Sequence, residues 1–185
     1  MHRTSLRLGA ILVAAAAFAF PASALAATAE SAGTITAGSL SLTTEAAPTL
    51  SATLDGTDQT PTYTLPMTVE DSTGSGAGWN TTITSTQFTT GGEAPLTLST
   101  EASSMTGVTS VCAEGTCTDP TNAVTYSLPV PAAATPPAAV KFFNAEAGTG
   151  LGKFTVTPTV GVSIPANTYA GTYTSTVTLA SVSGP

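Results

Sequence analysis

The stretch PTYTLPMTVE, residues 61–70, decides the fold class because apolar and polar side chains alternate along it. Successive side chains of a strand point to opposite faces, so this alternation predicts a strand with one buried face. The residues on that face are Tyr63, Leu65, Met67 and Val69. Pro66 has no backbone N–H to donate, which predicts an edge position or a bulge within this strand.

The same alternation recurs later in the chain, and turn signals separate the segments. The clearest segments are 124–130, 154–164 and 173–179, and weaker ones are 34–43, 50–54, 96–99, 108–111 and 140–143. Gly-containing turns stand at 55–56, 91–92, 148–150 and 170–171. Residues 129–140, PVPAAATPPAAV, predict an extended, proline-rich crossover loop. We therefore expect one all-β domain, a single antiparallel β-sandwich of Ig-like or jelly-roll-like architecture.

The first 26 residues have the features of a secretory signal peptide. Residues 1–7 are basic, residues 8–20 (LGAILVAAAAFAF) are apolar and uncharged, and small residues stand at Ala24 and Ala26. An uncleaved anchor is the alternative, but the apolar run is too short to span a bilayer stably. We expect a mature domain of residues 27–185 that is exported and does not insert into the membrane after cleavage.

The expected mature range is acidic and has few charges. All eleven acidic residues lie from Glu30 onward, against only two basic residues, Lys141 and Lys153. Such a domain would repel nucleic acid phosphates and anionic lipid surfaces, which excludes both as partners. The single histidine, His2, lies in the signal peptide, so histidine-based triads and histidine-ligated metal sites are excluded as well.

Cys112 and Cys117, in CAEGTC, are predicted to form a disulfide that closes a small loop in an exported chain. The alternative, a metal site, would need further ligands, and the mature range has no third cysteine and no histidine. We expect neither a metal nor a cofactor.

Two pairs of carboxylates are the remaining candidates for catalysis. Glu70 and Asp71 are adjacent on a predicted strand, so they point to opposite faces and do not converge on one substrate. Asp55 and Asp58 lack the further oxygen ligands of a calcium site and are interpreted as solvated turn acids. We predict no catalytic residue and no enzymatic activity.

The single tryptophan, Trp79, follows a glycine-rich run in GSGAGWNTTITSTQF, residues 74–88. One interpretation is that the glycines turn the backbone tightly and keep the face beside the indole clear, so that it stacks on sugar faces or an acetamido methyl group. The other is that Trp79 caps the end of the sandwich and packs on Tyr173 or Ile83, the commoner role for a lone tryptophan near a strand start.

Residues 68–89 (TVEDSTGSGAGWNTTITSTQFT), residues 140–185 and the signal peptide together resemble the WxL-domain surface proteins of Gram-positive bacteria, in an actinobacterial form. That family has a Trp-x-Leu motif after a Gly-rich turn and a second one in its closing strand. In this chain Thr81 replaces the leucine of the first motif. Leu179 stands where the second tryptophan is usual, and Ser181 where its leucine would be, so both motifs are degenerate.

The resemblance implies a secreted protein of the cell surface, attached non-covalently to the cell wall through peptidoglycan or another wall polymer, with other surface proteins as further partners. The candidate wall-binding residues are Trp79, Asn80 and Tyr173. A second hypothesis is a structural or adhesive subunit of a surface assembly, in which the segment 27–44 is donated as a strand to a neighbouring chain. A third is a secreted protein with no affinity for the wall.

Overall fold

The computed structural model describes residues 30–44 and 47–185. The predicted signal peptide, residues 1–26, lies outside the described residues. The chain divides into two units, residues 1–35 and 36–185. Of the first unit only residues 30–35 are described; they are exposed and have no regular secondary structure.

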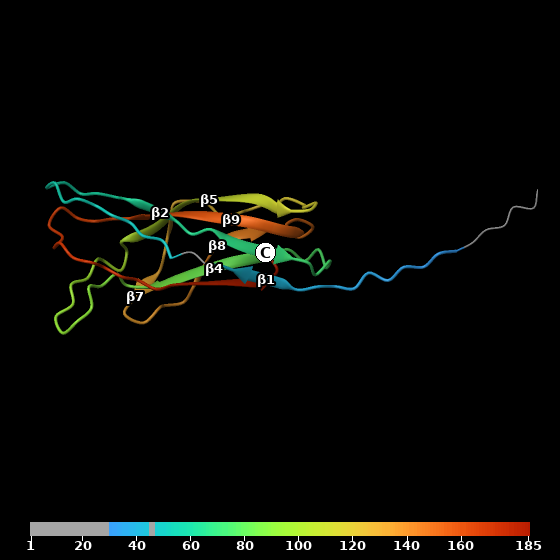
Figure 1. Ribbon diagram of the computed structural model, residues 1–185, viewed down its shortest axis with the longest axis horizontal. Coiled ribbons are helices and arrows are strands. Elements are labelled where there is room, and N and C mark those ends of the chain that lie inside the picture. Colours follow the sequence, from blue (N-terminus) through green and yellow to red (C-terminus); the bar gives the residue numbers. More distant parts are fainter. Residues whose placement is uncertain (1–29, 45–46) are drawn as a thin grey trace, which may run out of the picture. The chain divides into compact units, whose positions relative to one another are not determined.

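The second unit is a sandwich of two sheets, which confirms the expected all-β fold (Figure 1). Its strands are β1 (Leu40–Thr43), β2 (Thr62–Thr64), β3 (Met67–Asp71), β4 (Trp79–Thr86), β5 (Ser103–Glu114), β6 (Leu128–Pro129), β7 (Ala132–Ala133), β8 (Val140–Ala145), β9 (Gly152–Val162) and β10 (Val177–Ser183). One sheet has the order β1-β3-β9-β5-β6, with β2 also on β9. In the other, β10, β7 and β8 all pair with β4. Every pairing is antiparallel except the short β4–β7 one.

The stretch that predicted the fold forms β2 and β3, which pair with the same strand in one register. Thr62 lies opposite Gly161 and Met67 opposite Val156 of β9, and the Leu65 N–H between them donates to the Pro158 carbonyl oxygen. Pro66 interrupts the ladder between β2 and β3, as its missing N–H requires. All four apolar residues that alternate along 61–70 are buried, as predicted.

The core lies between the two sheets, and β9 supplies its centre. Phe154, Val156, Val160 and Val162 of β9 are fully buried, facing inward at every second position. The opposite sheet contributes Ile83 of β4 and Phe142 of β8. Burying an apolar side chain of this size contributes roughly 1.5–3 kcal/mol, so these residues dominate the stability of the sandwich.

Some predicted strands are absent or shorter. Within 124–130 only Leu128 and Pro129 pair, because side chains take over the backbone groups upstream: the Asn122 Oδ1 accepts from the Val124 and Asn144 N–H groups. Segment 50–54 forms no strand, and 96–99 contributes a single bridge, Thr89 to Thr97. Segment 34–43 shortens to β1. The described residues include no helix of the length and apolarity needed to cross a membrane.

Candidate functional site

Trp79 begins β4 and is fully buried. Its Nε1–H donates to the Gly150 carbonyl oxygen at 2.9 Å, and its ring centroid lies 5.8 Å from that of Phe143 with the planes tilted by 47°. The ring contact is with Phe143 and not with Tyr173, whereas Ile83, the other residue that the packing interpretation named, belongs to the same buried core as Trp79. A ring with no exposed surface has no face on which a sugar can stack in this structure.

Gly74 and Gly76 have positive φ values in the turn before Trp79, as the sequence indicated, whereas Gly78 and Gly150 allow close packing around the start of β4. Gly78 has a φ of +74°, and a Cβ there would overlap the Ala145 carbonyl oxygen. Gly150 has a φ of +75°, and its Cβ would lie 2.6 Å from the Trp79 Nε1. Only glycine combines this backbone conformation with so close an approach. Gly150 therefore closes the space beside the indole, and Gly78 lets the chain pass close to the end of β8.

Asn80 holds the end of the chain. Its side-chain Nδ2 donates to the Gly184 carbonyl oxygen at 2.8 Å, and the Gly184 N–H donates to the Gly78 carbonyl oxygen. In the same region Trp79 lies opposite Ser183 in the ladder between β4 and β10. The Asn80 side chain thus fastens the end of the last strand to β4, while the Trp79 side chain contacts the loop at Gly150 and β8.

Tyr173 lies at the other end of the same sheet. Its neighbour Thr174 bridges to Thr89, which follows the end of β4. Ten residues of extended chain separate Thr89 from Trp79, about 33 Å at the rise of a strand. The structure therefore does not bring the three predicted wall-binding residues together.

Tyr173 lines a cleft of about 910 Å³ between the two sheets. One wall carries Tyr63, Leu65, Val162 and Ile164, and the other carries Phe88, Leu98, Val177 and Leu179. The rim comes from segments 47–54 and 168–176, and among the residues that the structure describes, which leave out Glu45, none that lines the cleft is charged. Leu179, at the position where the resemblance expects the second tryptophan, is one of the residues that leave this space open. We call this feature the tyrosine cleft, because three of the four tyrosines of the chain line it.

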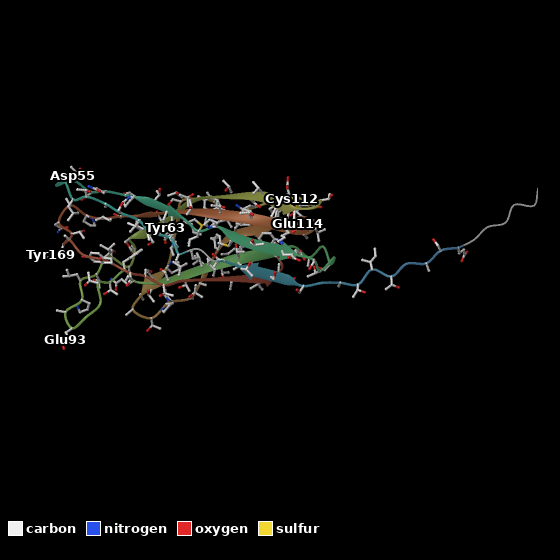
Figure 2. The ribbon with its side chains drawn as sticks, in the orientation of Figure 1. Asp55, Tyr63, Glu93, Cys112, Glu114 and Tyr169 are labelled. Atoms are coloured by element: carbon white, nitrogen blue, oxygen red, sulfur yellow. A yellow bond between two sulfur atoms is a disulfide. The ribbon has the colours of Figure 1, made fainter. Side chains whose placement is uncertain are left out.

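The three tyrosines differ in exposure. Tyr169 is 72% exposed, and its carbonyl oxygen accepts from the Tyr173 hydroxyl at 3.0 Å, which fixes the Tyr173 ring at the rim. Tyr63 is only 8% exposed, and burial raises its pKa to about 12. Figure 2 shows Tyr169 at one end of the domain and Cys112 toward the other, with Tyr63 between them. The cleft offers aromatic faces at its rim and an apolar interior, which suits binding without chemistry.

Sequence reasoning assigned no site role to Tyr63 or Tyr169. The alternation predicts that Tyr63 faces inward, but whether such a residue meets core or cleft depends on the opposite sheet. Tyr169 lies in a loop, NTYAG, without a periodic signal. The repeated tyrosines at 169 and 173 were the available signal, because both flank the turn at 170–171.

The cysteines and carboxylates lie elsewhere. Cys112 and Cys117 form a disulfide with an S–S distance of 2.03 Å. The Asp55 Oδ1 accepts from the hydroxyl and N–H of Thr57, which lowers the Asp55 pKa, and the Asp58 Oδ1 accepts from the Ala166 N–H. In the described part of the chain no group of three or more potential metal ligands comes together. These acids cap loops.

Comparison with curated proteins and with solved structures found no match. A family model, described as the WxL domain, surface cell wall-binding, matches residues 11–181. That range includes β4 with its Trp79, the tyrosine cleft and most of β10. The chain therefore belongs to the WxL domain family of surface proteins that bind the cell wall.

Proposed function

We propose that this protein is exported and attaches non-covalently to a polymer of the cell wall, without catalysing a reaction. The observation that carries the proposal is the match to a wall-binding family over most of the chain. The sequence supports export through the features of residues 1–26. The absence of histidine after residue 26 supports a binding role.

The attachment surface in this proposal is the tyrosine cleft. Tyr169 and Tyr173 present aromatic faces at its rim, and such faces stack on the apolar faces of sugar rings. The described residues of the lining are uncharged and largely apolar in the interior, which suits the apolar faces of a repetitive sugar polymer. Tyr173 therefore remains a proposed contact residue.

Trp79 and Asn80 take a positioning role in the same proposal. The Asn80 side chain fastens the end of β10 to β4, Trp79 holds the adjoining loop at Gly150, and β10 carries Val177 and Leu179 into the wall of the cleft. Loss of either contact is expected to weaken wall binding only as far as it loosens these elements.

The test is co-sedimentation of the mature protein, residues 27–185, with washed peptidoglycan sacculi. We expect the wild type to pellet and the Tyr169→Ala/Tyr173→Ala double variant to remain in solution, with circular dichroism showing that the variant is folded. The matched control is Tyr126→Phe, which removes a hydroxyl that donates to Phe142, outside the cleft. If the wild-type protein stays in solution with the sacculi, wall attachment is overturned. If the double variant pellets as the wild type does, the wall-binding site does not include Tyr169 and Tyr173.

A second candidate function, assembly by strand exchange, is favoured by the segment before β1. Residues 40–43 pair with β3 of the same chain, so the part left to donate is 30–37. Within the described structure these eight residues are exposed and make no hydrogen bond, and Ile35 is 100% exposed. Deleting residues 27–37 should leave the fold intact and convert oligomers to monomers in gel filtration. Oligomers that persist after the deletion would exclude this mode of assembly.

A further inference from the structure

Strand β5 runs along the margin of the sandwich in Figure 1 and has a free edge over most of its length. On one side it pairs with β9 from Ser103 to Glu114, whereas on the other side β6 covers only Ser104 and Met105. Within the described residues no strand pairs with 107–112 on that side, and bulges in the ladder with β9 lie only at the two ends of this stretch. The stretch also has no charged residue and no proline, which commonly protect an edge against a further strand.

The direction of the backbone groups on this edge follows from the opposite strand. The Pro158 carbonyl oxygen accepts from the Leu65 N–H, so Pro158 faces the segment between β2 and β3 and not β5. Val108 lies opposite Pro158, and in an antiparallel pair such a residue points its own N–H and C=O away from the partner strand. Every second residue does the same, so Ser110 and Cys112 also present both groups to the free edge. These groups can pair with one more strand.

The side chains of the edge show the same lack of a neighbour. The Ser110 Oγ is buried and has no hydrogen-bond partner among the described residues, although buried hydroxyls are nearly always bonded. The next side chain, that of Val111, points to the opposite face of the sheet and is 59% exposed. A strand added to this edge would place a side chain beside each of them.

The chain itself contains a segment that suits this edge. Residues 30–37, which we call the arm, are exposed, make no hydrogen bond within the described structure and contain no proline and one charged residue. Ile35 is 100% exposed and stands between two threonines. The register that sets Ile35 beside Val111 therefore sets a threonine beside Ser110, whichever way the arm runs. Pairs of β-branched residues and pairs of hydroxyl residues across strands both stabilise a sheet.

An arm in this register must come from another copy of the chain. Val111 is level with Thr43 of β1 in the sheet, but β9 and β3 lie between them, so they are three inter-strand spacings or about 14 Å apart. The Gly38 N–H donates to the Ser72 carbonyl oxygen beyond the start of β1, which holds the root of the arm still farther from Val111. Ile35 stands three residues before Gly38 and reaches at most about 11 Å from it.

We propose that the protein assembles head to tail, with residues 30–37 of one copy pairing as an additional strand on the free edge of β5 in the next copy, Ile35 beside Val111. The arm and the edge are different surfaces, so a copy that receives an arm still has its own arm to donate. Such contacts produce chains or rings of copies and not two-fold dimers. This inference rests on the second candidate function, assembly by strand exchange, and names its acceptor.

Two proline variants distinguish the edge of β5 from a sheet edge in general. Ser110→Pro removes an N–H that faces away from β9 and should leave the β5–β9 ladder intact. The matched control is Ser181→Pro on β10. The Thr176 carbonyl oxygen accepts from the Thr86 N–H, so every second residue from Thr176 onward faces β4, and Ser181 faces away from it. Circular dichroism should show that both variants are folded; if Ser110→Pro is not, Val111→Lys replaces it, because a charged side chain at this exposed position also blocks the edge.

The test is sedimentation velocity of residues 27–185 over a range of protein concentrations. We expect the wild type and Ser181→Pro to form species larger than a dimer, and Ser110→Pro and a variant that lacks residues 27–37 to stay monomeric. When these two monomeric variants are mixed, they should form a 1:1 complex and nothing larger, because one supplies only an arm and the other only an edge. Ile35→Ala in the variant that supplies the arm should weaken this complex by up to about fivefold.

Each other outcome contradicts a stated part of the proposal. A mixture that stays monomeric, or oligomers that persist in Ser110→Pro but not without the arm, would overturn β5 as the acceptor and leave strand exchange standing. Dimers that form without the arm would overturn the arm as the occupant and indicate pairing between the β5 edges of two copies. A wild type that is monomeric at every concentration would overturn strand exchange itself, and with it this inference.

Discussion

Replacing Gly150 with alanine is expected to destabilise the domain more than the same replacement two residues earlier. Gly148 and Gly150 both have positive φ values, +81° and +75°, so alanine at either position pays a backbone strain of about 1–2 kcal/mol. The positions differ in their surroundings. A Cβ at Gly148 would meet nothing within 4 Å, whereas one at Gly150 would lie 2.6 Å from the Trp79 Nε1 and overlap the Ala145 Cβ.

The crowding adds its own free-energy cost at Gly150. Overpacking a well-filled core costs about 1–3 kcal/mol, so Gly150→Ala should lose about 2–5 kcal/mol in all when the strain is included. Gly148→Ala should lose only the strain. The difference between the two variants then measures the packing around Trp79 alone.

The assay is urea unfolding followed by fluorescence. Trp79 is the single tryptophan of the chain, so its emission reports directly on the site that is perturbed. Each kcal/mol should also lower the Tm by about 2–4 °C in a domain of this size. Equal losses in the two variants would refute the conclusion that the loop at Gly150 closes over the indole.

Three further perturbations test other parts of the structure. Trp79→Phe removes the donor to the Gly150 carbonyl oxygen and leaves a buried acceptor unpaired. The free energy of unfolding, measured in urea, should fall by about 1–3 kcal/mol. A fall of less than about 0.5 kcal/mol would contradict this prediction. Replacing Cys112 and Cys117 together by serine should cost about 2 kcal/mol, because the disulfide closes a loop with a sequence separation of only 5; unchanged thermal unfolding would count against this. Burial raises the Tyr63 pKa from 10.0 to about 12, so above pH 10 the unfolded chain releases this proton before the folded protein does. The free energy of unfolding should therefore fall by about 1.4 kcal/mol per pH unit between pH 10 and pH 12. The Tyr63→Phe variant should lose stability less steeply over this range.

Alternation made the central sheet predictable, because side chains in a strand with one buried face must repeat every two residues. Tyr63, Leu65, Met67 and Val69 follow that rule and are buried. The rule also holds for burial along 122–129, where half-buried and exposed residues alternate. It did not predict pairing there, because the Asn122 side chain and the Tyr126 hydroxyl bind backbone groups of β8.

The site was less predictable because it depends on segments far apart in the chain. Whether Trp79 is open or buried is decided by Gly150, 71 residues later, and no local pattern around GWNTT shows that contact. The cleft likewise forms where β2 and the start of β10 face each other without enough side-chain volume between them. Leu179 departs from the second motif, but the sequence alone does not show that a cleft lies beside it.

The pairing of distant strands has a consequence for how the chain folds. The central strand of one sheet, β9, and the strand that completes the other, β10, both come from the last 34 residues. The Asn80 side chain bonds to Gly184, which lies 104 residues later in the chain. The chain must lose the entropy of closing these long loops before the contacts between the strands can stabilise it. This order of events slows folding. A chain that emerges from a channel with its N-terminus first would therefore lack β9 in one sheet and β10 in the other until its last 34 residues had followed. Without both strands the core between the sheets would stay open, and the chain would remain able to pass through a narrow pore for most of its passage.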